Sequence, residues 1–294
     1  MKILKGIFAA SISVLNEDLS LNISKTIDHC ESLIDNGCHG VAVFGSTGQA
    51  QLIPVSEKIK LLNTLSKSKY SEKYIIGTGF NSLIETVNFL KIATSLKFEN
   101  FLIMPPAFYK YDHNGVVNFY SKLIEAVPNC KIILYNFEKL SGYKFDVDTV
   151  KILVKKFPKQ IIGIKDSTYN IFQELKLKNF LVFPGSELKL LKGLQLGCAG
   201  IISATCNITS ELSRKVYDDF FAKGKSDNNQ KLCDVRVTFD KYNLISALHS
   251  CYSVQDKIYK NVLPPLSLLE QNDYLDLEKK LNSLNFKSNS LMAA

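Results

Sequence analysis

The sequence has few of the features that mark metal, disulfide-bonded or membrane proteins. None of its seven cysteines forms a Cys-x-x-Cys pair, and its four histidines show no metal-ligand spacing. An odd number of cysteines, several of them in apolar runs, indicates reduced, buried thiols in a cytoplasmic protein. No apolar run approaches the length of a membrane span, and the first residues lack the apolar core of a signal peptide. We therefore expect no metal and no membrane contact.

Charge of one sign is not concentrated anywhere in the chain. The formal net charge is +8, but the lysines are scattered, with no basic stripe interleaved with aromatics of the kind that binds nucleic acid. Such a distribution describes a solvated surface that attracts anionic substrates mildly at most. The charge pattern thus predicts no nucleic-acid partner.

What is present is the composition of an ordinary globular protein. The chain has 294 residues, of which 46% are hydrophobic and 22% charged, and this length suffices for one large α/β barrel or two ordinary domains. Short apolar runs alternate with helical patterns along it. The eight expected strands span residues 6–15, 40–45, 74–79, 100–104, 131–136, 161–165, 180–183 and 200–204.

Apolar strands that alternate with helices predict a parallel sheet covered on both faces. Eight repeats favour closure into an α/β (β/α)₈ TIM barrel, with residues 1–224 as the barrel and residues 225–294 as a C-terminal helical extension packed on it. The alternative is a doubly wound open sheet. That fold would need a glycine-rich phosphate turn after the first strand, and Ala10-Ser11-Ile12-Ser13 is not such a turn.

The sixth apolar run ends on a lysine. Because alternate residues of a strand share a face, Ile161, Gly163 and Lys165 should point to one side and Ile162 and Ile164 to the other. If both faces are covered, the Lys165 amine lies in the interior, and a buried lysine amine can act as a nucleophile towards a carbonyl. The stretch alone also fits the commoner case of a strand-end lysine whose amine reaches back to water.

Catalytic groups of such barrels come from the C-terminal ends of the strands. Four expected ends carry polar residues there, namely Gly45-Ser46-Thr47-Gly48, Tyr135-Asn136, Lys165 with Ser167, and Gly185-Ser186-Glu187. The Gly45–Gly48 segment can be a plain strand-to-helix turn, or it can aim N–H groups and hydroxyls at a carboxylate. Tyr135 can be an aromatic residue of the core. Together they predict that the turn holds a 2-keto acid, Lys165 attacks its keto carbon and Tyr135 moves the protons. The resulting iminium allows an adjacent carbon–carbon bond to be made or broken without a metal or other cofactor.

Three motifs carry a resemblance to a known family. In combination, Gly45-Ser46-Thr47-Gly48, Tyr135-Asn136 before Leu140-Ser141-Gly142, and Gly163-Ile164-Lys165-Asp166 resemble the dihydrodipicolinate synthase / N-acetylneuraminate lyase family of class I pyruvate aldolases. The similarity runs from Gly6 to the Pro264-Pro265 region. It implies a TIM-barrel lyase whose only cofactor-like group is a covalent lysine Schiff base, a substrate made of pyruvate plus an aldehyde, and a homotetramer built as a dimer of dimers.

The resemblance assigns roles to individual residues. The implied site consists of Ser46, Thr47 and Gly48 for the pyruvate carboxylate, Tyr135 as the proton shuttle, Lys165 as the Schiff-base lysine, and the backbone of Ile202. Ser167 and Glu187 are expected to contact the distal part of the substrate. The family's relay tyrosine, which in many members reaches across the dimer, falls on Ala107-Phe108-Tyr109, and Tyr109 fills that position only if the loop shifts.

Further positions distinguish the subfamilies. Leu140 stands where the synthases place an arginine that holds the second substrate's carboxylate, which weakens the synthase interpretation. Leu140-Ser141-Gly142 and Ser46 are more similar to sialic-acid-type lyases, although Gln49 replaces a usual glutamate and Ala204 a hydroxyl residue.

Met104-Pro105-Pro106 and Asp166 are similar to aldolases of 2-keto-3-deoxy sugar acids. We therefore expect an aldolase or lyase acting on a 2-keto-3-deoxy sugar acid or a sialic-acid-like substrate. The alternatives are a 4-hydroxy-tetrahydrodipicolinate synthase of lysine biosynthesis, a deoxy sugar acid dehydratase, and a barrel that binds a keto acid without turning it over.

Overall fold

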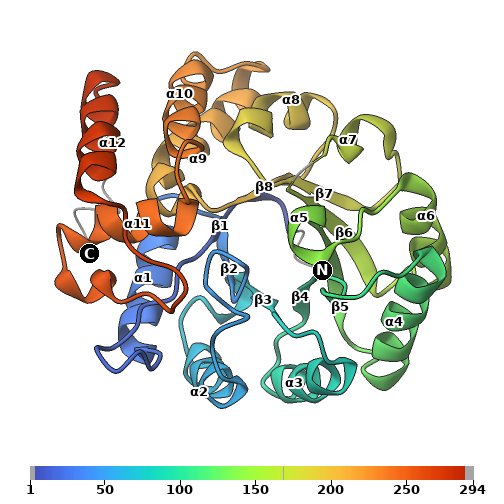
Figure 1. Ribbon diagram of the computed structural model, residues 1–294. Helices are drawn as coiled ribbons and strands as arrows, with labels where there is room; N and C mark the ends of the chain where they lie inside the picture. The colour runs from blue at the N-terminus through green and yellow to red at the C-terminus, as the bar shows by residue number, and fades with distance from the viewer. Residues whose placement is uncertain (1–3, 168, 289–294) are drawn as a thin grey trace.

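A ring of eight parallel strands forms the centre of the molecule. The computed structural model describes residues 4–167 and 169–288. The strands are β1 (Gly6–Ala10), β2 (Gly40–Val43), β3 (Tyr74–Gly77), β4 (Asn100–Ile103), β5 (Lys131–Asn136), β6 (Ile161–Asp166), β7 (Leu181–Pro184) and β8 (Gly200–Ser203). They follow the order β7-β6-β5-β4-β3-β2-β1-β8. The Ala199 amide, just before β8, donates to the Val182 carbonyl of β7 at 2.9 Å and joins the two edges. Figure 1 shows the ring with helices around it, which confirms the predicted (β/α)₈ barrel.

Helices connect successive strands, and most of them cover the outside of the ring. They are α1 (Ile23–Asp35), α2 (Val55–Leu65), α3 (Leu83–Ser95), α4 (His113–Ala126), α5 (Glu138–Ser141), α6 (Val147–Lys156), α7 (Ile171–Glu174), α8 (Leu190–Gln195) and α9 (Cys206–Lys223), with 3₁₀ turns η1 (Ser71–Lys73) and η2 (Glu187–Lys189). Side-chain caps start several of them: Asn22, Ser82, Asp112 and Asp146 each accept a hydrogen bond from an amide in the first turn. The caps explain why these helices begin where they do.

The first strand is shorter than expected. The apolar run continues to Leu15, but pairing with β2 and β8 ends near Ala10. Ile12 and Val14 leave the sheet and pack in a second core formed by the C-terminal helices. The apolar run is longer than the strand because its first half packs in the barrel and its second half contributes to the core of the C-terminal helices.

The face alternation expected for β6 is only partly right. The register of β6 against β5 shifts by one residue after the first pair, so one residue of β6 is extra. Ile161 consequently lies in the outer core, and Ile162 packs on the barrel interior, opposite to the prediction. Beyond the bulge the expected faces hold: Ile164 points outward, and Lys165 pairs with Tyr135, a residue of the interior cluster.

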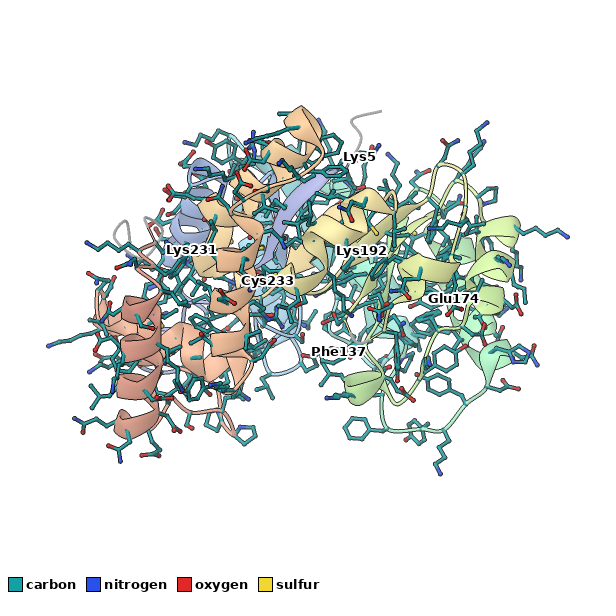
Figure 2. The ribbon with its side chains drawn as sticks, turned by 90° about the horizontal axis from the view of Figure 1, so that it is seen from above. Lys5, Phe137, Glu174, Lys192, Lys231 and Cys233 are labelled. Atoms are coloured by element: carbon teal, nitrogen blue, oxygen red, sulfur yellow. The ribbon has the colours of Figure 1, made fainter. Side chains whose placement is uncertain are left out.

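The strand direction is visible from the side in Figure 2. Lys5, just before β1, lies at one end of the barrel, and Phe137, just after β5, lies at the other. The latter end is therefore the one at which the strands finish, and the loops there build the site.

A helical extension follows the barrel. After Gly224, which ends α9 in the left-handed conformation, come α10 (Asn229–Phe239), α11 (Leu244–Ser253), η3 (Lys257–Lys260) and α12 (Gln271–Ser283). Its buried side chains share one core with Ile12, Val14 and Ile208 of the barrel. The extension thus lies against α1 and α9, as Figure 1 also shows.

Two buried histidines link this extension to the barrel. The Nε2 atom of His29 on α1 lies 2.8 Å from the Asn207 amide oxygen, and its Nδ1 atom lies 3.2 Å from the Tyr259 hydroxyl. His249 on α11 has its Nδ1 atom 2.9 Å from the Tyr259 carbonyl oxygen. Burial lowers the pKa of each imidazole to about 4, so both rings are neutral at pH 7.

Acidification is therefore expected to weaken the folded state. An unfolded histidine has a pKa of about 6.5, so between that value and about 4 the unfolded chain binds more protons than the folded one. The stability is fully present above pH 6.5 and is lost as the pH falls towards 4. From pH 7 to pH 5 we expect the free energy of unfolding, measured by urea denaturation, to fall by about 2 kcal/mol for each histidine.

A matched pair of variants isolates this effect. His29→Asn should reduce the loss between pH 7 and pH 5 by about 2 kcal/mol and leave the contribution of His249. His113→Gln, at an exposed position, should leave the pH dependence unchanged. An equal slope in both variants would contradict the assignment to His29.

Candidate active site

An amine, a phenol and a hydroxyl meet at the carboxyl end of the barrel. Lys165 of β6 pairs in register with Tyr135 of β5, and its Nζ atom lies 4.2 Å from the centre of the Tyr135 ring. The Tyr135 hydroxyl is 3.0 Å from the Ser46 Oγ atom, which follows β2. Lys165 is 3% exposed and Tyr135 is 4% exposed. Three residues expected in one site from the sequence are thus brought together from three strands.

The floor of this site is apolar. Lys165 pairs with Phe183 of β7, which packs edge-to-face on Phe8 with ring centres 5.8 Å apart. Ile202 of β8 is fully buried in the same interior cluster, which also contains Tyr135. Within the described ranges, no carboxylate lies at ion-pair distance from the Lys165 amine. The amine therefore lies buried against the Tyr135 ring, in a largely apolar part of the barrel interior.

The turn after β2 is closed by its own backbone. The Gly48 amide donates to the Gly45 carbonyl at 3.1 Å, and the Gln49 amide donates to the Ser46 carbonyl at 3.0 Å. A Cβ atom on Gly48 would lie 2.9 Å from the Ser11 carbonyl oxygen, so only glycine fits this close approach. In residues 4–167 and 169–288, the amides of Ser46 and Thr47 donate no hydrogen bond.

Non-glycine residues on both sides of the turn adopt the left-handed conformation. Phe44 has φ of 56° and Gln49 has φ of 55°. This conformation raises the free energy of a residue that carries a Cβ atom. The Gln49 side chain accepts from the Leu263 amide at 2.8 Å, and its Nε2 atom lies 3.4 Å from His249 Nε2. Gln49, which replaces the usual glutamate, thus attaches the turn to the C-terminal extension through its neutral side-chain amide.

Ser167 lies on the rim after β6. Its amide donates to the Asn136 carbonyl at 3.0 Å, and its side chain packs directly on Gly185, where a Cβ atom would lie 2.5 Å from Ser167 Oγ. The residue is half-buried. Its place beside the mouth is consistent with the expected contact to the distal part of a substrate, which stays a prediction.

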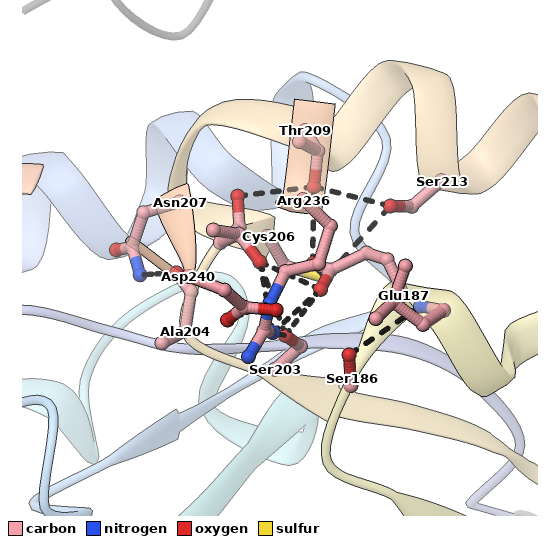
Figure 3. A network of polar contacts seen from close by, with 12 residues as sticks. Ser186, Glu187, Ser203, Ala204, Cys206, Asn207, Thr209, Ser213, Arg236 and Asp240 are labelled. Carbon is pink, nitrogen blue, oxygen red and sulfur yellow. Dashed lines mark hydrogen bonds and ion pairs between the residues drawn. The ribbon is translucent and has the colours of Figure 1, made fainter. Parts of the chain in front are cut away.

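Glu187 is not available to a substrate. It is fully buried, and its Oε2 atom accepts hydrogen bonds from Ser203 at 2.7 Å, Thr205 at 2.6 Å and Arg236 at 2.9 Å (Figure 3). Its Oε1 atom accepts from Thr209 at 3.2 Å. The structure contradicts the expected substrate contact, because the carboxylate instead joins the ends of β7 and β8 to α9 and α10.

Tyr109 does not join the site of its own chain. It is 80% exposed, and the neighbouring Phe108 is 91% exposed with φ of 76°. The loop is held at Ala107, whose amide donates to the Asn81 side chain at 2.8 Å. No hydrogen bond joins Tyr109 to Tyr135 in the part of the chain that the structure describes. A relay through Tyr109 would therefore require a second subunit, and it stays a prediction.

A buried polar pair behind the site was not assigned a structural role from the sequence. Asn136 donates to the Asp166 carboxylate at 3.1 Å, and Asp166 also accepts from the Tyr169 amide at 3.0 Å and the Ile171 amide at 2.9 Å. Strand alternation was the available signal, because it places Asp166 on the face opposite Lys165. The pair thus holds the backbone at Tyr169 and Ile171, where α7 begins.

Three further properties concern the described residues alone. None of their helices has both the length and the apolar content to cross a membrane. Among them, no three His, Cys, Asp or Glu side chains gather as a metal-ligand group. All seven cysteines are free thiols, and all but Cys233 are buried.

Comparisons with known proteins identify the family of the chain. The model of the dihydrodipicolinate synthetase family matches residues 3–284. A 4-hydroxy-tetrahydrodipicolinate synthase from Ligilactobacillus salivarius is 28% identical over 94% of this chain and 97% of its own. An N-acetylneuraminate lyase from Clostridium perfringens is 28% identical over 73% of this chain and 76% of its own.

A solved structure shows the same fold. The Escherichia coli K12 prophage protein of the dihydrodipicolinic acid synthase family, in complex with pyruvate, superposes with a TM-score of 0.87 at 22% identity, covering 97% of this chain and 100% of its own. The match of the family model spans nearly the whole barrel and its extension. The chain therefore belongs to the dihydrodipicolinate synthetase family, and it is an enzyme of the lyase class.

Proposed function

We propose that this enzyme forms a Schiff base between Lys165 and pyruvate, and makes or breaks the carbon–carbon bond next to it. The observation that carries the proposal is the buried Lys165 amine 4.2 Å from the Tyr135 ring, whose hydroxyl is 3.0 Å from Ser46. An amine nucleophile beside a proton-transferring phenol is the arrangement that imine formation needs. The pyruvate complex of the E. coli relative supports the choice of keto acid.

The proposed steps use only groups of this chain and the substrate. The Lys165 amine attacks the keto carbon, the amine proton and the proton needed by the departing water pass through Tyr135, and an iminium forms as water leaves. In the cleavage direction a base removes the proton of the substrate hydroxyl, and the electrons of the breaking carbon–carbon bond flow into the iminium to give an enamine and an aldehyde. Protonation of the enamine and hydrolysis release pyruvate. The iminium accepts the electrons, so the sequence of steps requires no metal or other cofactor.

The turn after β2 is proposed to hold the pyruvate carboxylate. The amides of Ser46 and Thr47 donate no hydrogen bond in the described ranges, and both residues carry hydroxyls. Adjacent N–H groups and hydroxyls in one tight turn suit an anion. Gly48 allows the turn to approach Ser11 closely, and the Ile202 backbone completes the wall on β8.

Removal of one phenolic oxygen should slow this chemistry strongly. We expect Tyr135→Phe to lower kcat by about a hundredfold or more, because proton transfers at the iminium lose their donor and acceptor. The ring itself remains, so the packing around Lys165 is kept. Steady-state kinetics measures the effect, with whichever sugar acid or other compound of the substrate panel the parent enzyme turns over. A rate within a factor of about three of the parent enzyme would contradict the role of Tyr135.

For the second substrate we propose a 2-keto-3-deoxy sugar acid or a sialic-acid-like compound. Leu140, at the position of the synthase arginine, is 43% exposed on α5 and presents no cation to a second carboxylate. The relatives include both a synthase and a sialic acid lyase, so the synthase and the dehydratase remain the alternatives.

A substrate panel separates these activities. Release of pyruvate from 2-keto-3-deoxygluconate or N-acetylneuraminate is the expected result. Consumption of pyruvate only in the presence of aspartate semialdehyde would establish the synthase instead. Binding of pyruvate with no turnover of any partner would favour a keto-acid-binding barrel.

The assembly and location of the enzyme also belong to this proposal. We propose a homotetramer built as a dimer of dimers in the cytoplasm, with pyruvate plus an aldehyde as its partners. The exposed Tyr109 suits a residue that acts on the site of a second subunit. Sedimentation of the purified protein tests the tetramer.

A further inference from the structure

One buried lysine takes no part in the proposed chemistry. Lys58 on α2 is fully buried. Its Nζ atom donates to the Thr78 carbonyl at 2.9 Å and lies 3.9 Å from the centre of the Phe80 ring and 5.9 Å from that of Phe44. Throughout the described residues, no carboxylate lies within ion-pair distance of this amine.

Burying such an amine is costly. Burial lowers the pKa of Lys58 to about 7, and Glu85 on α3 raises it by a smaller amount. A methionine or leucine would fill the same space without that cost. A charge-carrying side chain at this place therefore needs a reason other than packing.

The contacts of Lys58 lead to the carboxylate turn. Phe44 is the residue from which the turn starts, and it holds a left-handed backbone with φ of 56°. Its carbonyl oxygen lies against Gly77, where a Cβ atom would be 2.2 Å away, next to Thr78. Gly79 likewise packs on Ala50 at the other end of the turn. The Lys58 amine thus bridges the residues that support both ends of the turn.

We propose that Lys58 is a positioning residue for the carboxylate turn. Its amine donates to the Thr78 carbonyl in either protonation state and, when protonated, also attracts the rings of Phe80 and Phe44. These contacts stabilise the left-handed backbone of Phe44, and thereby the direction in which Ser46 and Thr47 point. An attraction between a desolvated cation and an aromatic face is strong enough to oppose the cost of that backbone. The inference rests on the proposed function of the turn, but the placement of the turn itself is independent of any ligand.

Two measurements on Lys58→Met test the proposal. The first is the pyruvate concentration that gives half-maximal borohydride trapping, which should rise about tenfold while the extent of trapping at saturation stays the same. The second is amide hydrogen exchange of residues 45–50 without ligand, which should become about tenfold faster. Lys60→Met, at an exposed position of the same helix, should change neither.

The outcomes are distinct. A folded Lys58→Met with unchanged half-saturation and unchanged exchange overturns the proposal and leaves the function intact. A changed half-saturation with unchanged exchange also overturns it, because the charge would then act on the substrate directly. If the parent enzyme traps no pyruvate, the proposed function fails, and the exchange measurement alone decides the role of Lys58. If Lys58→Met does not fold, Phe80→Leu replaces it, and unchanged exchange in that variant overturns the proposal.

Discussion

Replacement of Lys165 by methionine is expected to lower kcat/KM by at least about a thousandfold, to the limit of detection. The amine is the only proposed nucleophile, and among residues 4–167 and 169–288 no other lysine amine lies over the Tyr135 ring. Methionine matches the length of the side chain and places no charge in the apolar floor, so the barrel should remain folded. Steady-state kinetics on the active compound of the substrate panel measures the loss of kcat/KM, and circular dichroism shows whether the variant is folded.

The control for this variant is another lysine. Lys192→Met, on the exposed surface of α8, should keep full activity. Retention of more than about a tenth of the parent activity in Lys165→Met would refute the Schiff-base mechanism. If pyruvate affinity survived in Lys165→Ala in a protein without turnover, the barrel would be a binding protein.

Loss of the Arg236 guanidinium is expected to cost about 3–5 kcal/mol of stability. Arg236→Met leaves the fully buried Glu187 carboxylate with hydroxyl donors but no counter-charge (Figure 3). Burial raises the pKa of Glu187, and Arg236 with the hydroxyls of Thr205 and Ser203 lowers it by more in sum, so the net pKa is below its ordinary value. This lowered pKa contributes stability that is present above the unfolded pKa and is lost as the pH falls through the folded one.

Two further variants show whether charge is the cause. Adding Glu187→Gln to Arg236→Met should recover most of the loss, because the amide oxygen can still accept from the hydroxyls without needing a cation. Asp240→Asn, which removes the partly exposed partner of Arg236, should cost less than about 1 kcal/mol. Urea unfolding of the four proteins gives the comparison, and a double variant less stable than Arg236→Met would contradict this explanation.

Much of the site could be predicted from local patterns. Apolar runs followed by helical patterns predict the barrel, and the barrel places the ends of β2, β5 and β6 at one mouth. Lys165 and Tyr135 face one another because both lie on the interior side of paired strands. Alternation does not reveal the bulge at Ile162, because a one-residue register shift depends on how β5 and β6 pair and not on the sequence of β6 alone.

The failures of prediction arise from contacts between distant parts of the chain. Glu187 follows β7 at the mouth, as a substrate-binding residue would, but its carboxylate pairs with Arg236 of α10, 49 residues later. The left-handed Phe44, the buried Lys58 and the attachment of Gln49 to Leu263 are likewise consequences of packing. Local sequence patterns do not predict such contacts, because the partners are distant in the chain.

Reductive trapping shows directly whether Lys165 forms an imine with pyruvate. The purified protein is incubated with pyruvate and borohydride, digested, and each lysine peptide is examined by mass spectrometry. We expect one reduced pyruvate unit on Lys165, which is absent from Lys165→Met and forms more slowly in Tyr135→Phe. A folded protein with no adduct, or with the adduct on a different lysine, would contradict this expectation.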